Sequence, residues 1–214
     1  NNVRYRDSIE KLSMIFELGK MSANQRYHLI TQTVLPRPIA WILTANEEDS
    51  FNLAPFSYFA ALSSEPALLV VSIGNKEKNL NKDTKTNLLR DKECILHIPS
   101  VQNAEDVNTS AATLKYGQSE VSEQGLTLTP FSPNLPRLSD AKVAMHCRLY
   151  DVHQLSESQS ACYLEVLNIH VEDSILSEAE GRYFIDSLGL SPLSRLGGSD
   201  YGVLNEKLTL KRPS

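Results

Sequence analysis

Two segments of the sequence place a cation where it could hold a phosphate group. Arg37 lies in Pro36-Arg-Pro-Ile-Ala-Trp41, where a rigid Pro-x-Pro backbone fixes it at the junction of a helix and a strand. An arginine held in this way suits a bidentate phosphate contact. In Lys82-Asp-Thr84, a lysine stands at an expected helix start, with Asp83 or Thr84 as the N-cap, and free amide groups there attract an anion. Taken alone, the first segment also fits a solvated arginine beside two loop prolines, and the second a capped, solvated helix start.

Two further segments could contact a flat ring. In Asn52-Leu-Ala-Pro-Phe-Ser57, Pro55 breaks the ladder of a strand and frees neighbouring backbone groups for a ligand. The small side chains of Ala54 and Ser57 permit a close approach. Near the C-terminus, Arg195-Leu-Gly-Gly198 precedes Tyr201, and the glycine pair allows unusual backbone angles between them. Alone, the first segment also fits an edge strand, and the second a flexible turn.

Short strands must position most of these residues. We expect strands, from their apolar and β-branched patterns, over residues 39–45, 51–62, 67–73, 93–99, 142–155 and 161–176. Pro55 implies an edge position or a bulge, and the continuous apolar run 67–73 predicts a strand buried on both faces that ends at Gly74. Turns at 46–50 and 156–160 predict hairpins. About six strands at this spacing favour a small, closed antiparallel barrel, so the fold class is mainly β with short inserted helices.

Helical patterns interrupt the strands. Residues 8–18, 82–92 and 101–116 are expected to be helical, and Ser22 with Gln25 has the form of a capping box that starts a helix ending before Pro36. Tyr27, Ile30 and Val34 would form the apolar face of that helix. Residues 117–139 and 186–202 read as loops. We therefore expect an N-terminal extension over 1–21 and one domain over 22–214.

Composition excludes several classes of function. The chain has 214 residues, and its formal charge of 21 − 26 = −5 leaves no electrostatic footprint for nucleic acid. Its apolar runs are too short to span a membrane. Three widely spaced cysteines and five histidines show no metal-ligand spacing. We expect buried, inert thiols, because each cysteine lies in an apolar, strand-like run. We also expect a cytoplasmic protein, because no signal peptide is visible.

Taken together and in order, the four segments resemble the flavin reductase-like proteins of the FMN-binding split-barrel superfamily. The resemblance covers roughly residues 22–205. It implies a six-stranded Greek-key split barrel that works as a homodimer, with FMN at the interface between the two subunits.

The resemblance also assigns candidate FMN contacts. It implies that the flavin is lined by Asn52, Ala54, Pro55 and Ser57. The phosphate would be held by Lys82, Asp83 and Thr84, with Arg37 and Thr44 as further candidates. Trp41 would cover one side of the ring, Arg195 and Tyr201 would close the site from the partner chain, and Ser72 is a weaker candidate.

The implied activity is an FMN-dependent oxidoreductase in which NADH or NADPH gives a hydride to the flavin and a small-molecule acceptor takes the electrons. The sequence has no Gly-x-Gly-x-x-Gly fingerprint for a dinucleotide. A flavin-binding sensor, store or electron carrier without turnover therefore remains an alternative, as does an oxidase or oxygenase of a small substrate. No side chain is assigned as a catalytic acid or base, because hydride transfer needs none.

Overall fold

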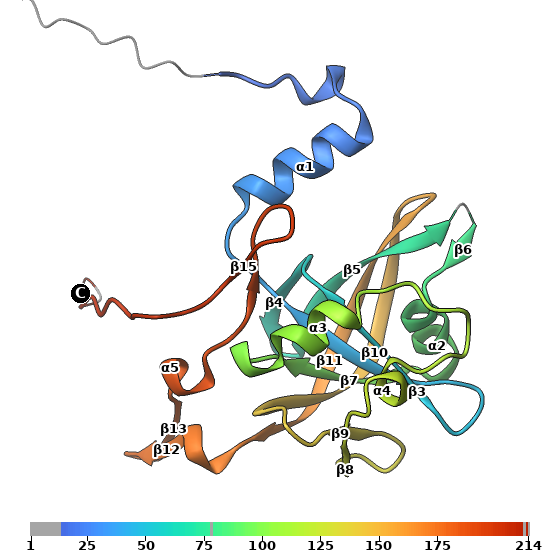
Figure 1. Ribbon diagram of the computed structural model, residues 1–214. Helices are drawn as coiled ribbons and strands as arrows, with labels where there is room; N and C mark the ends of the chain where they lie inside the picture. Colours follow the sequence, from blue (N-terminus) through green and yellow to red (C-terminus); the bar gives the residue numbers. More distant parts are fainter. Residues whose placement is uncertain (1–13, 78, 212, 214) are drawn as a thin grey trace, which may run out of the picture.

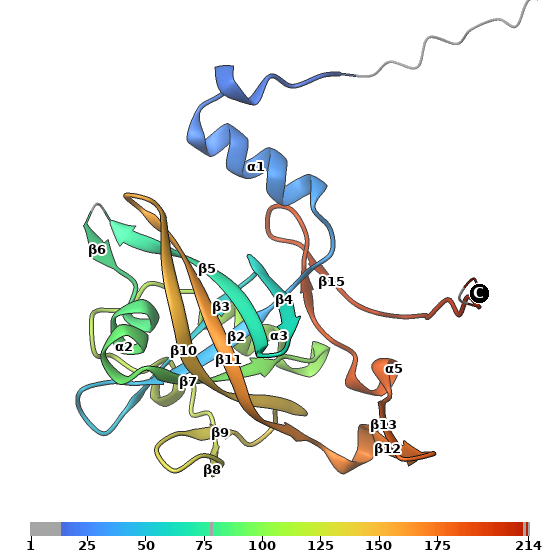
Figure 2. The same cartoon turned by 180° about the vertical axis from the view of Figure 1, so that it is seen from behind.

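Seven strands of the computed structural model follow one another in a curved antiparallel sheet (Figures 1 and 2). The structure describes residues 14–77, 79–211 and 213. In spatial order the strands are β3 (Phe51–Phe56), β2 (Ala40–Ala45), β7 (Glu93–Ile98), β10 (Val143–Ser156), β11 (Gln159–Val171), β5 (Ala67–Glu77) and β4 (Phe59–Ser64). Residues of β3 and β5 also contact each other, so the sheet curls into a barrel. The predicted mainly β barrel is confirmed.

Short elements connect these strands. The helices are α1 (Ala23–Thr33), α2 (Asp83–Asp91), α3 (Ala104–Thr109), α4 (Glu120–Glu123) and α5 (Ser187–Leu190), and single 3-10 turns cover Leu18–Lys20, Val101–Asn103 and Asp173–Ile175. The short strands are β1 (Arg37–Pro38), β6 (Leu80–Asn81), β8 (Leu128–Pro130), β9 (Pro136–Leu138), β12 (Leu176–Ala179), β13 (Arg182–Ile185), β14 (Ser194–Arg195) and β15 (Tyr201–Gly202). None of the helices in the described part of the chain has the length and apolar content that a bilayer crossing requires.

Two apolar cores lie on opposite faces of β2 and β7. Ile42 and Leu96 pack inside the barrel with residues of β5, β10 and β11. Trp41, Leu43 and Ile95 face the other way and pack under α3, α4 and the β8–β9 hairpin. Because successive side chains of a strand point to opposite faces, β2 is buried on both sides and its sequence is continuously apolar. The three cysteines all lie buried and free in the barrel core, as predicted.

The strand predicted over 51–62 forms two strands. Pro55 stays within β3, and the break comes at Ser57 and Tyr58, before β4. Leu53 N donates to a side chain instead of to a strand. Pro55 is two residues further on and therefore faces the same free edge, where its missing N–H costs no ladder bond. The predicted edge position is thus confirmed, whereas the predicted break is shifted.

Two other predicted elements differ from the structure. The strand predicted over 67–73 continues through Gly74 to Glu77, and only alternate residues of it are buried, so burial on both faces was wrong. Residues 101–116 are helical only to Thr109, because the chain then turns to line a cleft. Of the helix predicted over 8–18, residues 8–13 lie outside the described residues, and 14–17 form no regular element.

The helix α1 begins as predicted and leaves its apolar face uncovered. Ser22 and Gln25 form the complete capping box. The predicted apolar face, Tyr27, Ile30 and Val34, is exposed. Figure 1 shows α1 standing away from the barrel, so none of the described residues buries this face.

His97 is a buried, fully bonded histidine that makes stability depend on pH. Its Nδ1 contacts Trp41 O at 3.0 Å, and its Nε2 accepts from Leu138 N at 3.0 Å, which requires a neutral ring. Burial lowers the pKa of His97 to about 4. Because this lies below the unfolded value, the stabilisation is complete above pH 6.5 and is lost as the pH falls toward 4, by about 2 kcal/mol at pH 5.

We expect urea unfolding at pH 7.5 and pH 5 to show this loss in the wild type. His97→Gln should remove that part of the pH dependence. The difference in free energy of unfolding between the wild type and His97→Gln should therefore be about 2 kcal/mol smaller at pH 5 than at pH 7.5. His153→Gln is the matched control, since His153 is exposed. Equal acid losses in the wild type and His97→Gln would show that His97 does not titrate in this way.

Candidate active site

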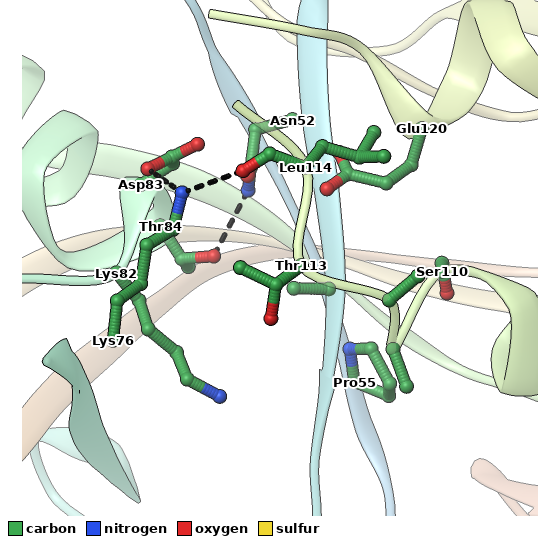
Figure 3. Close-up of a pocket in the computed structure, with 13 residues that line it drawn as sticks. Asn52, Pro55, Lys76, Lys82, Asp83, Thr84, Ser110, Thr113, Leu114 and Glu120 are labelled. Atoms are coloured by element: carbon green, nitrogen blue, oxygen red, sulfur yellow. Dashed lines mark hydrogen bonds and ion pairs between the residues drawn. The ribbon is translucent and has the colours of Figure 1, made fainter. Parts of the chain in front are cut away.

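A cleft lies where β3, the end of β5 and the start of α2 meet the segment that joins α3 to α4 (Figure 3). It brings together segments that are far apart in the sequence. The lining residues are Asn52, Ala54, Pro55, Lys76, Lys82, Asp83, Thr84, Ser110, Ala111, Ala112, Thr113, Leu114 and Glu120. Two of the four sequence motifs therefore meet at one cavity.

The start of α2 presents free amide groups to this cleft. Lys82, and not Asp83 or Thr84, is the N-cap, and no side chain caps the helix. The Lys82 carbonyl accepts from Lys85 N and Thr86 N at 3.0 and 3.1 Å. The predicted N-cap was therefore wrong, although the helix start was right. Since no capping side chain occupies the first-turn N–H groups, the partial positive charge of the helix end can act on a ligand.

Two lysines line the cleft and differ in their contacts. Lys76 Nζ contacts Asp83 Oδ1 at 2.7 Å and Leu114 O at 3.1 Å (Figure 3). Lys82 Nζ lies 5.5 Å from the centre of the Phe56 ring. Burial, and then the charge of Lys76, lower the pKa of Lys82. Both causes disfavour the charged form of Lys82. An anion beside Lys82 would favour that charged form and offset them.

A buried polar network forms the floor of the cleft. Asn52 Nδ2 donates to Thr84 Oγ1 at 2.9 Å and to Thr44 Oγ1 at 3.4 Å. Asn87 Nδ2 also donates to Thr44 Oγ1, at 3.2 Å. Thr44 thus lies behind Asn52 and does not line the cleft. Because the donated bonds fix the amide of Asn52, the network holds β3 and α2 in one relative position.

Small residues provide the flat walls. Ala54 and Pro55 line the cleft from β3, and Ala111 and Ala112 line it from the segment after α3. Sequence reasoning assigned the second pair to a helix and missed it. It also missed Lys76 and Glu120. Glu120 is the first residue of α4, 6% exposed, and its Oε2 accepts from Leu53 N at 2.9 Å.

Arg37 lies apart from the cleft. It is 6% exposed and donates to backbone carbonyls of Thr31, Val34 and Leu196 and, at 3.4 Å, to Ser57 Oγ. These bonds join the end of α1 to the C-terminal segment. In this structure the donors of Arg37 serve protein acceptors, which is a structural role, and its expected phosphate contact stays a prediction. Ser57 belongs to the same cluster.

Two other candidates also lie outside the cleft. Trp41 is 1% exposed, and its Nε1 donates to Ser110 Oγ at 2.9 Å. In this chain it supports the wall of the cleft from within the core and cannot stack on a ligand there. Ser72 accepts from Gln159 Nε2 at 2.7 Å on the face of β5 opposite to the buried residues Val71 and Ile73.

Arg195 and Tyr201 form one cluster on the paired strands β14 and β15. The Arg195 guanidinium lies 4.6 Å from the centre of the Tyr201 ring and donates to Gly198 O at 2.8 Å. Tyr201 OH donates to Asn108 Oδ1 at 3.2 Å, which ties this hairpin to α3. Neither residue lines the cleft of its own chain.

Comparison with known proteins identifies the family. The model of the flavin reductase like domain matches residues 32–186. The chain belongs to the flavin reductase-like family. The family is one of oxidoreductases, and the match includes every residue that lines the cleft.

Solved structures of this fold agree with the match. Nitrilotriacetate monooxygenase component B from Bacillus cereus is 27% identical with a TM-score of 0.84, over 92% of this chain and 98% of that one. The 2-nitrobenzoate 2-nitroreductase of Pseudomonas fluorescens is also 27% identical with a TM-score of 0.84, over 94% and 96%. A candidate flavin reductase with a split barrel domain from Shewanella frigidimarina is 18% identical with a TM-score of 0.80, over 94% and 100%. The fold is thus the expected split barrel.

Proposed function

We propose that this protein is an FMN-dependent oxidoreductase that takes a hydride from NADH or NADPH and passes the electrons to a small-molecule acceptor. The observation that carries the proposal is the half-buried Lys82 beside the uncapped start of α2, next to a slot of small residues. Membership of the flavin reductase-like family supports a flavin as the ligand of that cleft.

The residues of the cleft fit the chemistry of FMN. Lys82 and the first amides of α2 suit its phosphate, and the small walls at Ala54 and Pro55 suit a flat ring. The carbonyls of Leu53 and Pro55 face the free edge of β3 and can accept hydrogen bonds. When bound, the flavin supplies the hydride chemistry, and the protein supplies position and electrostatics.

The proposed acceptor is a small molecule. Two structural relatives at 27% identity are a nitroreductase that acts on 2-nitrobenzoate and a component of a monooxygenase. Both names are consistent with electrons leaving for a small partner. We place the protein in the cytoplasm, where nicotinamide donors are present.

A titration of the purified protein with FMN tests the proposal at its first step. We expect a yellow complex with one FMN per chain, visible as a shift of the flavin absorbance bands. A protein that shows no shift and retains no FMN in equilibrium dialysis would contradict the proposed function.

We also propose a homodimer in which the second subunit completes the flavin site. Strands β10 and β11 leave Tyr150, Leu167 and Ile169 exposed, and an apolar groove continues from Ile169 to Tyr183 and Ile185. A second copy would cover this surface. Arg195 and Tyr201, which do not line the cleft of their own chain, would then reach the cleft of the partner.

Light scattering tests the dimer. We expect a mass twice that of the 23.9 kDa chain, and Ile169→Asp should halve it, because a carboxylate cannot be buried in an apolar interface without a partner. The monomeric variant should bind FMN more weakly. Glu48→Ala, at an exposed residue between β2 and β3 and away from β10 and β11, should stay dimeric. A monomeric wild type that binds FMN tightly would contradict the shared site.

A further inference from the structure

The cleft has a balance of charge that a phosphate ligand would upset. Lys76 and Lys82 contribute two positive charges, and Asp83 and Glu120 contribute two carboxylates. A phosphate monoester carries roughly −1.5 to −2 charges at pH 7. These groups line one cleft and are buried or half-buried, so salt screens them less than it screens exposed charges. The ligand and both carboxylates would therefore repel one another.

Glu120 is held in place at the wall of this cleft. It is 6% exposed and stands directly after Ser119, whose hydroxyl caps α4 by accepting from Ser122 N. One carboxylate oxygen, Oε2, accepts from Leu53 N at 2.9 Å. The side chain cannot swing into solvent without leaving that buried amide unpaired, which is unfavourable. A ligand phosphate would thus meet a fixed acid group.

The two carboxylates differ in their partners. Asp83 is paired with Lys76 at 2.7 Å. Glu120 has a backbone amide as its nearest partner. Burial raises the pKa of the Glu120 carboxyl above its usual value, against the hydrogen bonds from Leu53 N and its own backbone amide, which lower it. Asp83 adds to the rise, and Lys76 opposes it. Lys82 also lines the cleft. Glu123, which lies on α4 with Glu120, is exposed. Of the two acid groups that line the cleft, Glu120 is thus the one whose bonded partner is an uncharged amide.

We infer that Glu120 takes up a proton from solvent when the phosphate of the flavin binds. This inference rests on the proposed function, since it takes the phosphate to lie at the start of α2. The proton bonds to the carboxylate, and the acid becomes neutral with no other bond changed. Glu120 is then a residue that sets the pH dependence of cofactor binding and selects the phosphorylated form of the flavin at lower pH.

The experiment measures the dissociation constant of FMN from pH 5.5 to 8.5 for the wild type and Glu120→Gln. The glutamine keeps the acceptor for Leu53 N and carries no charge. We expect Glu120→Gln to bind FMN about tenfold more tightly than the wild type at pH 8.5, since one pKa unit corresponds to a factor of ten. The two proteins should converge at pH 5.5. The titration of the phosphate itself affects both equally and cancels in the ratio.

Two controls separate the outcomes. Riboflavin lacks the phosphate, so the ratio of wild-type to variant affinity should not change with pH for riboflavin. Glu123→Gln should follow the wild type. Failure of the wild type to bind FMN at any pH would defeat the proposed function. Binding with the same pH dependence in the wild type and Glu120→Gln would defeat the role of Glu120 alone.

Calorimetry of the wild type keeps the inference testable if Glu120→Gln fails to fold. FMN binding at pH 7.5, where the phosphate of free FMN is already almost entirely the dianion, is measured in buffers of different ionisation enthalpy and gives the number of protons exchanged. We expect a net uptake that is larger for FMN than for riboflavin. Equal proton exchange for the two flavins would overturn the inference.

Discussion

Lys82→Met is expected to weaken FMN binding by about 10- to 100-fold, the cost of losing a charge-assisted hydrogen bond to the phosphate. Lys82 Nζ lies at the uncapped start of α2, over the Phe56 ring. Methionine keeps the length and the apolar stem of the side chain. Because Lys82 caps the helix through its backbone carbonyl, the variant should keep the stability of the wild type.

The affinity for riboflavin decides whether the lost contact is to the phosphate. Lys82→Met should change riboflavin binding by less than threefold, since riboflavin has no phosphate to lose. Lys115→Met serves as the control, because Lys115 is exposed after the cleft-lining segment. An unchanged affinity for FMN in Lys82→Met would remove Lys82 from the site.

Arg37→Ala is expected to lower the free energy of unfolding by roughly 3–5 kcal/mol, because three backbone carbonyls lose their buried donor. The guanidinium of Arg37 reaches Thr31 and Val34 at the end of α1 and Leu196 near the C-terminus. For a chain of this size we expect the melting temperature to fall by roughly 10 °C.

Denaturant unfolding and FMN titration together separate a structural role of Arg37 from a phosphate contact. Arg37→Ala should keep the FMN affinity of the wild type at a temperature where it is folded. Arg148→Ala, whose side chain is 59% exposed, should lose less than 1 kcal/mol, as expected for a surface pair. A stable Arg37→Ala protein with weak FMN binding would reverse the assignment.

Local sequence signals predicted the strands and the elements that carry the cleft. The apolar pattern of β2, the turn after it and the start of α2 are properties of neighbouring residues, and the structure has them where they were expected. Asn52 and Thr84 were singled out separately, and they meet in one hydrogen bond of 2.9 Å. The resemblance of ordered motifs to one family supplied this link.

Other parts of the site depend on contacts between distant segments. Arg37 was correctly located at a helix–strand junction, but one of its acceptors, Leu196 O, lies 159 residues away. The role of Glu120 comes from Leu53 N, 67 residues earlier. A pattern of neighbouring residues cannot show such partners. The only local signal at Glu120 was Ser119, a good N-cap before an acidic residue.

Anaerobic mixing of the FMN complex with NADPH, and in parallel with NADH, tests the central claim most directly. The measurement is the flavin absorbance in a stopped-flow instrument. The proposed function predicts that at least one nicotinamide bleaches the flavin band within seconds and that air restores it. A yellow protein that neither nicotinamide bleaches would contradict the claim and leave a flavin carrier or an oxidase of another substrate.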